Sequence, residues 1–297
     1  MILDFRLKVF NTVVNYQSFS KAAIELCITQ PAVTKHISEL EKQIGSPLFI
    51  RHGSKISITP QGEILHRYAQ RILGLYRDLN NEFASEKALC NGEIRIGAST
   101  TISQYILPVI LAKFKSRYPL IAVELISGNS REIERLAAER EIDLGLIEGN
   151  SNIATLHYDT FIKDEIVLVT SVANNRSCKD EISCKELSQL PFVFRENGSG
   201  TLDVIDAALQ EKGIQRRDLH IQLYLDSSES IKRYLLQSAT YAFISIAAVT
   251  DELKDNKLRI VDVADLEISR DFRFVSLHGS YGKLIEMFRT FCLSNYN

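Results

Sequence analysis

Residues 29–37 read Thr29-Gln30-Pro31-Ala32-Val33-Thr34-Lys35-His36-Ile37, and this stretch decides the fold of the first part of the chain. Pro31 fits the first turn of a helix, where the missing N–H of proline is no loss. Apolar residues then recur at spacings of four, three and four, which predicts a buried stripe of Val33, Ile37, Leu40 and Ile44. Gly45 suits a left-handed cap at the end of this helix.

The opposite face of the same helix is polar. It carries side chains that hydrogen-bond base edges and phosphates, namely Gln30, Thr34, Lys35 and Ser38. A brief turn at Cys27-Ile28 separates this helix from an earlier one that Ser18 can cap, which predicts a helix-turn-helix. Two short strands follow, Leu48–Ile50 and Ile56–Ile58, and we expect them to form a wing.

Thr59-Pro60 begins a long helix with a second apolar pattern. The residues of this seam recur at spacings of three and four on an otherwise polar helix, and they are Leu65, Tyr68, Ile72, Leu75 and Leu79. A lone helix would expose them, so we expect pairing with a second copy. The alternative is that the seam packs on the chain's own head or body.

The region after Asn91-Gly92 contains an internal repeat. A strand–helix–strand–helix–strand pattern begins at Glu93, and corresponding strands recur about 98 residues further along the chain. This duplication predicts two parallel-sheet subdomains with right-handed crossovers. Two strands, Leu156–Lys163 and Glu165–Thr170, are expected to connect the halves, and Arg270–Leu277 to return to the first.

Small polar residues follow the predicted strands, where ligands of parallel sheets bind. Many precede helix N-termini, whose free N–H groups favour an anion or a carboxylate. The candidate effector-binding residues are Ser99, Thr100, Thr101, Ser130, Glu148, Arg195, Asn197, Gly198, Ser199 and Thr201. Taken singly, serine and threonine before a helix are usually only caps. Arg195 would add positive charge, and Glu148 would accept from an amine or a hydroxyl.

Composition narrows the class of protein. The 297 residues are 45% hydrophobic and 24% charged, with a net charge of −2, as in ordinary globular proteins. Residues 1–60 carry seven Lys/Arg against four Asp/Glu, so a mildly basic head precedes an acidic body. The charged N-terminus and the short apolar runs indicate no signal peptide and no membrane span, so a cytoplasmic location is expected.

Catalytic and metal-binding patterns are missing from the sequence. It contains no P-loop, no nucleophile elbow and no C-x-x-C pair, and its six histidines are dispersed. We therefore expect neither an enzyme nor a bound metal or cofactor. Cys178 and Cys184 flank a short loop, and ordinary reduced thiols are favoured over a redox pair.

The order of these parts resembles the LysR-type transcriptional regulators over the whole chain. The resemblance is most specific in Phe19–Ala23, Thr29–Thr34, Glu39–Glu41, Gly45–Phe49, Arg51 and Thr59–Gly62. It implies an α/β protein with a winged helix-turn-helix at 1–59, a linker and dimerisation helix at 60–90, and an effector domain at 91–297. That domain would resemble a periplasmic binding protein, with subdomain I at about 91–163 and 270–297 and subdomain II at about 164–269.

The resemblance also implies function and partners. The DNA-contacting residues would be Gln30, Pro31, Ala32, Thr34, Lys35, Ser38, Arg51 and Lys55. The partners would be an interrupted dyad in promoter DNA, a small effector and further copies of the chain in a homodimer or homotetramer. The body looks closest to the branch that regulates sulfur assimilation and carbon fixation. The competing interpretation is a cytosolic small-molecule-binding protein whose head contacts proteins instead of DNA.

Overall fold

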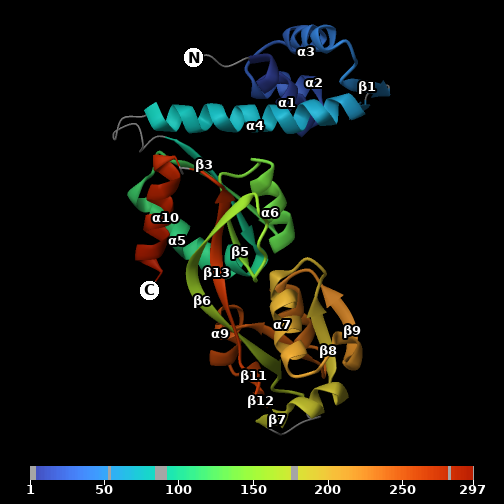
Figure 1. Cartoon of the computed structure of the whole chain (residues 1–297), viewed down its shortest axis with the longest axis vertical. Coiled ribbons are helices and arrows are strands. Elements are labelled where there is room, and N and C mark those ends of the chain that lie inside the picture. The colour runs from blue at the N-terminus through green and yellow to red at the C-terminus, as the bar shows by residue number, and fades with distance from the viewer. Residues whose placement is uncertain (1–4, 53–54, 84–91, 175–179, 280–281, 297) are drawn as a thin grey trace. The chain divides into compact units, whose positions relative to one another are not determined.

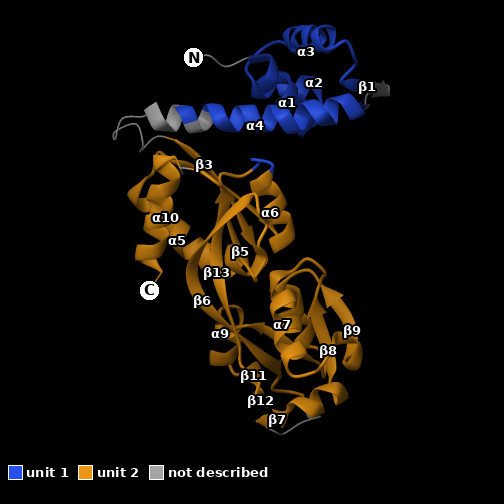
Figure 2. Cartoon of the chain, viewed as in Figure 1, with its two compact units in different colours: residues 1–85, 139–141 blue, residues 86–138, 142–297 orange. Residues whose placement is uncertain are grey.

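A computed structural model describes residues 5–52, 55–83, 92–174, 180–279 and 282–296. Its contacts divide the chain into two compact units, coloured in Figure 2. Unit 1 contains residues 1–85 and 139–141, and unit 2 contains residues 86–138 and 142–297.

Unit 1 is a small helical head followed by a long helix (Figure 1). Its elements are α1 (Phe5–Tyr16), α2 (Phe19–Glu25), α3 (Gln30–Ile44), β1 (Phe49–His52), β2 (Lys55–Ile58) and α4 (Pro60–Phe83). The antiparallel pairing of β1 with β2 forms the predicted wing. Helices α1, α2 and α3 pack around one apolar core that includes Phe10, Ile37 and Leu48.

Helix α3 begins and ends where the sequence predicts. The Thr29 hydroxyl accepts a hydrogen bond from the Ala32 backbone N–H at 3.3 Å, which caps the first turn. Gly45 ends the helix in the left-handed conformation, with φ of 75°. Val33, Ile37 and Leu40 are buried, but the prediction for Ile44 is wrong. Its side chain is 43% exposed because it lies in the last turn, at the edge of the core.

Helix α4 exposes an apolar row that differs from the predicted seam at one end. Leu65 packs against the core of the head. The exposed apolar residues on this helix are Ile64, Tyr68, Ile72, Leu75 and Leu79. Leu65 therefore packs on the chain's own head, as the alternative interpretation of the seam predicts. The other residues of the seam are exposed in the single chain.

Unit 2 is built on one mixed sheet, which has nine strands in the described part of the chain. The strands of unit 2 are β3 (Glu93–Ser99), β4 (Ala122–Gly128), β5 (Leu144–Glu148), β6 (Leu156–Ser171), β7 (Glu181–Ser183), β8 (Pro191–Arg195), β9 (His220–Leu225), β10 (Tyr241–Ser245), β11 (Leu258–Ile260), β12 (Asp262–Ala264) and β13 (Ile268–Leu277). Strands β7 and β12 form a separate parallel pair.

The duplication is visible in the strand order. The first half runs β4-β3-β5 and the second β9-β8-β10, so each half places its first strand between its second and third. Strands β6 and β13 lie between the halves and pair antiparallel along ten residues. The sequence predicts two separate strands in this region, but the structure has one continuous strand, β6. It is continuous because β13, β10 and β11 pair along successive parts of it.

Helices cover the faces of this sheet (Figure 1). They are η1 (Ile102–Ile106), α5 (Leu107–Arg117), α6 (Ser130–Ala138), η2 (Cys184–Gln189), α7 (Gly200–Glu211), η3 (Arg216–Asp218), α8 (Ser228–Leu235), α9 (Ile246–Lys254) and α10 (Lys283–Asn295). The predicted single helix over 104–118 is instead a π-helical turn, η1, followed by α5. Such π-helical turns frequently occur at functional sites.

The described ranges contain no helix with the length and apolar character that crossing a bilayer requires. They also contain no cluster of three or more His, Cys, Asp or Glu side chains arranged to hold a metal ion.

Candidate functional site

The predicted effector residues lie at the carboxyl ends of the strands and at the helix starts that follow. Ser99 ends β3, and Thr100 and Thr101 lead into η1. Ser130 is the first residue of α6, and Glu148 is the last of β5. From the second half, Arg195 ends β8, and residues 197–201 lead into α7. Strand ends of both halves thus contribute, as the duplication predicts.

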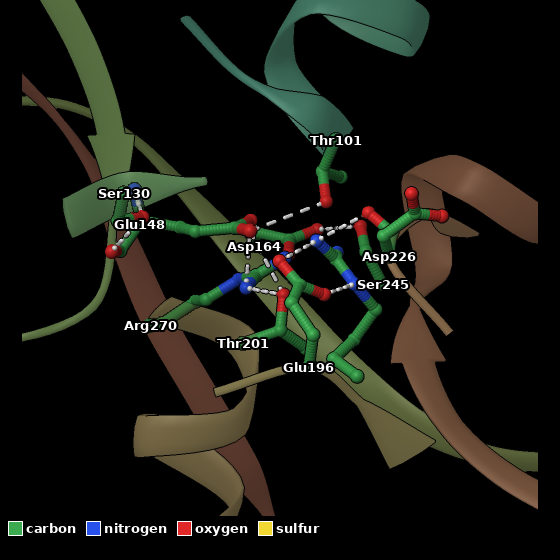
Figure 3. A network of polar contacts seen from close by, with 10 residues as sticks. Thr101, Ser130, Glu148, Asp164, Glu196, Thr201, Asp226, Ser245 and Arg270 are labelled. Carbon is green, nitrogen blue, oxygen red and sulfur yellow. Dashed lines mark hydrogen bonds and ion pairs between the residues drawn. The ribbon is translucent and has the colours of Figure 1, made fainter. Parts of the chain in front are cut away.

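The Glu148 carboxylate lies at the centre of a buried polar network (Figure 3). Its Oε1 accepts from the Thr201 hydroxyl at 2.9 Å and from the Thr101 hydroxyl at 3.5 Å. Its Oε2 lies 2.8 Å from Nη1 of Arg270 in an ion pair. Glu148 is only 1% exposed, so its oxygens are engaged by the chain's own side chains.

Arg270 on β13, Asp164 on β6 and Ser245 on β10 belong to this network but were not predicted from the sequence. The Nε of Arg270 donates to Asp164 Oδ2 at 2.8 Å, and its Nη1 donates to the Thr201 hydroxyl at 2.8 Å. The Ser245 hydroxyl donates to the other oxygen of Asp164, also at 2.8 Å. Burial raises the pKa of Asp164 above its ordinary value, in spite of the opposing effect of the Arg270 charge. One arginine therefore serves two buried carboxylates.

At Gly200 the two halves meet without room for a side chain. The Ser130 hydroxyl donates to the Glu148 carbonyl oxygen at 2.9 Å. A Cβ on Gly200 would lie 2.0 Å from that same carbonyl oxygen, so only glycine fits there. Gly198 has φ of 93° and accepts from the Arg131 N–H at 3.4 Å. The loop before α7 is thus packed directly onto the first half.

Several buried donors near these strand ends have no protein partner. They are Ser99 Oγ, Thr100 Oγ1, Ser199 Oγ and Arg195 Nη1. Arg195 is 2% exposed, and its Nε lies 2.9 Å from a Glu196 oxygen while Nη2 donates to the Asp226 carbonyl at 3.2 Å. A buried donor without an acceptor costs free energy unless a ligand or water supplies one. Asn197 differs, because it is exposed and accepts from Arg216 at 3.3 Å.

The predicted DNA-contacting face of α3 points away from the core of the head. Gln30, Pro31, Lys35 and Ser38 are exposed, and Ala32 and Thr34 are half-buried. The Gln30 side-chain amide donates to the Thr34 hydroxyl at 3.2 Å, and that hydroxyl donates to the Gln30 carbonyl at 3.1 Å. Arg51 and Lys55 lie on the wing strands, opposite Ile56 and His52. The side chains of Arg51 and Lys55 lie outside the described part of the structure.

The cysteines give no redox pair in the described residues. Cys184 is half-buried, and its thiol donates to the Ala264 carbonyl at 3.4 Å. Its suggested partner, Cys178, lies outside the described residues.

Fold and site together define a winged helix-turn-helix head joined to a duplicated ligand-binding body. Residues 5–63 match the family model "Bacterial regulatory helix-turn-helix protein, lysR family", and residues 88–296 match "LysR substrate binding domain". The chain belongs to the LysR family of transcriptional regulators. It is accordingly a DNA-binding regulator with a C-terminal effector-binding domain.

Individual relatives confirm the branch predicted from the sequence. The chain is 29% identical to the HTH-type transcriptional regulator CysL of Bacillus subtilis, over 98% of this chain and 96% of that one. It is 32% identical to a probable RuBisCO transcriptional regulator of Cyanidioschyzon merolae, over 98% of this chain and 97% of that one. Among solved structures, the chain is similar to the Synechocystis CcmR regulatory domain in complex with 2-PG. The match covers 70% of this chain and 98% of that domain, with a TM-score of 0.63 and 24% sequence identity.

Proposed function

We propose that this regulator responds to a small anion bound beside Ser99, Thr100, Ser199 and Arg195. The observation that carries the proposal is that each of these four groups has a buried polar atom without a partner that can donate a hydrogen bond. Donors without acceptors select a ligand rich in oxygen acceptors, and the Arg195 guanidinium favours a negative charge. A phosphate or carboxylate compound meets both requirements. The complex of CcmR with 2-PG supports the same class of ligand.

The effector test uses binding to the full-length protein. 2-PG and a panel of small carboxylates and phosphate esters are titrated calorimetrically into the wild type and into Ser99→Ala and Ser199→Ala. We expect at least one compound to bind the wild type, and each variant to lose about tenfold in affinity as one hydrogen bond to a charged group disappears. If both variants bound the compound with the same affinity as the wild type, the ligand would bind elsewhere.

We further propose that α3 reads DNA through Gln30 and Thr34, while Lys35 contacts phosphate. The mutual hydrogen bonds of Gln30 and Thr34 hold both side chains in a fixed arrangement on an exposed surface. A good base contact discriminates by roughly 1–3 kcal/mol, whereas a phosphate contact carries no sequence information. Arg51 and Lys55 on the wing would add further phosphate contacts.

The DNA test compares specific and random fragments at two salt concentrations. Gln30→Ala should weaken binding to the specific fragment more than to random DNA. Lys35→Ala should weaken binding to both and reduce the slope of log K against log salt by about one. Equal losses on the two fragments for Gln30→Ala would rule out its base-reading role.

Pairing of two copies through α4 completes the proposal. The exposed row from Ile64 to Leu79 is the apolar surface that such a pair would bury. Two heads joined in this way would meet the two halves of a dyad site.

A further inference from the structure

A cavity of about 440 Å³ has a wall formed by residues of the loop that follows β5, by the start of β6 and by residues of and after β13. The polar residues that line it are Asn150, Asn152, His157, Tyr158, Arg273 and His278. No carboxylate lines it in the part of the chain that the structure describes.

Arg273 is held in this wall with part of its guanidinium unused. Its Nη2 donates to the Ser151 carbonyl at 2.8 Å, and its charge lies over the Tyr158 ring at 4.6 Å from the centroid. Its Nε is buried and has no hydrogen-bond partner. Partial burial lowers the pKa of Arg273, yet it leaves this arginine charged at neutral pH. A fixed guanidinium with a free N–H favours an oxyanion.

Two histidines add further hydrogen-bonding groups at the mouth of the cavity. The rings of His157 and His278 lie 5.8 Å apart between centroids. Nε2 of His278 lies 3.2 Å from the Ala154 carbonyl oxygen. Because a carbonyl only accepts, this nitrogen carries the hydrogen, and Nδ1 of a neutral ring remains an acceptor.

The acidic groups near this wall are already occupied. The Tyr158 hydroxyl donates to Glu134 at 2.8 Å. Asp159 is paired with Arg289 and with Nε2 of His157. Asp271, two residues before Arg273, is the remaining acidic neighbour, and it does not line the cavity. Arg273 therefore supplies a positive charge to a lining that contains no carboxylate among the described residues.

We propose that this cavity is a second binding site, for a small oxyanion of the phosphate class. None of the described residues that line it belongs to the candidate effector site that contains Ser199. Its loop begins one residue after Gly149, whose added Cβ would lie 3.2 Å from Gly200, so the loop adjoins the contact between the halves. An anion held by Arg273 would bridge this loop to β13.

The test uses full-length protein and inorganic phosphate, with glycerol phosphate as a second arm, in phosphate-free buffer. Asn152 is exposed, so Asn152→Asp adds a negative charge to the cavity wall without removing a packed side chain. Repulsion between unit charges about 4 Å apart in water corresponds to roughly a fivefold loss of affinity. Asn256→Asp, an equal change on the exposed turn between α9 and β11, is the matched control.

Isothermal titration is expected to show phosphate binding that Asn152→Asp weakens at least about fivefold and Asn256→Asp leaves unchanged. Ser199→Ala should leave this binding event intact. Tighter binding of glycerol phosphate would identify a phosphate ester as the preferred ligand. Absence of any phosphate binding, insensitivity to Asn152→Asp, or complete loss in Ser199→Ala would each overturn the proposal.

Discussion

Glu148 and Arg270 form a 2.8 Å ion pair between side chains that are 1% and 0% exposed. Glu148 ends β5, and Arg270 lies on β13, one of the two strands that run between the halves. Thr201, at the start of α7, hydrogen-bonds to both of them. A displacement of the loop before α7 must therefore change the surroundings of this pair. The hydrogen bonds of Thr201 therefore connect the loop before α7 directly to β13, one of the strands that join the halves.

Loss of Arg270 should destabilise unit 2 strongly. Arg270→Met leaves the Glu148 and Asp164 carboxylates buried without a cation. Breaking a buried pair by removing one partner typically costs about 3–5 kcal/mol. The expected result is a drop of that size in the free energy of unfolding, measured with urea.

An exposed arginine supplies the control for this measurement. Arg233 pairs with Glu229 at 3.1 Å, but its side chain is 80% exposed. Arg233→Met should cost well under about 1 kcal/mol, because solvent screens such pairs. Similar losses of unfolding free energy for Arg233→Met and Arg270→Met would show that the buried network contributes no more to stability than an exposed ion pair.

Asp164 predicts a pH dependence of stability. Its folded pKa is raised above the ordinary value of 3.8 because burial disfavours the charged form. Its stabilising contribution is therefore fully present below pH 3.8 and is lost as the pH rises through the folded pKa. The unfolding free energy of the wild type minus that of Asp164→Asn should fall as the pH rises above about 4. A difference that stays constant, or that rises, would contradict this assignment.

The apolar row on α4 predicts the effect of a charge on assembly. Leu75 is 55% exposed in the single chain, and burial of a glutamate in a helix pair is unfavourable. Leu75→Glu should therefore shift the protein to smaller species in analytical ultracentrifugation. Gln70→Glu introduces the same side chain on the same helix outside this row and should leave the assembly unchanged. Equal sedimentation of the two variants would show that this row of α4 is not part of the interface.

The thiols should differ in reactivity. Burial raises the pKa of Cys292 to about 12, whereas Cys27 is exposed. Because the thiolate is the nucleophile, only roughly one Cys292 in ten thousand is reactive at pH 8. Iodoacetamide should alkylate Cys27 in the folded protein and Cys292 only after unfolding, as read by peptide mass spectrometry. Equal rates at both positions would show that the α10 core opens readily.

Local patterns were sufficient to predict the head and the duplication. Helix α3 depends on a cap, a proline, an apolar period and a glycine, all within seventeen residues of one another. Ile44 was misplaced because periodicity alone does not show where a core ends. Leu65 was misassigned because two neighbouring rows on α4 are apolar, and only packing on the head distinguishes them.

The centre of the site could be predicted only in part. The small polar residues at strand ends were found because the topology of parallel sheets places them together. Arg270 and Asp164 were missed, since they are 106 residues apart and lie within strands that the pattern treats as connections. Glu148 was found, but its engagement by Arg270 depends on the register of β13 against β5.

We propose that an anion at the buried donors controls DNA binding. The most direct test of this proposal is the dissociation constant for a selected genomic fragment, measured by fluorescence anisotropy with and without the bound anion. Allosteric coupling is typically about 1–3 kcal/mol, so the constant should change at least about fivefold when the anion saturates the wild type, and Ser199→Ala should need about ten times more anion for the same change. An unchanged constant in the wild type, or the same dependence on anion concentration in Ser199→Ala, would contradict this proposal.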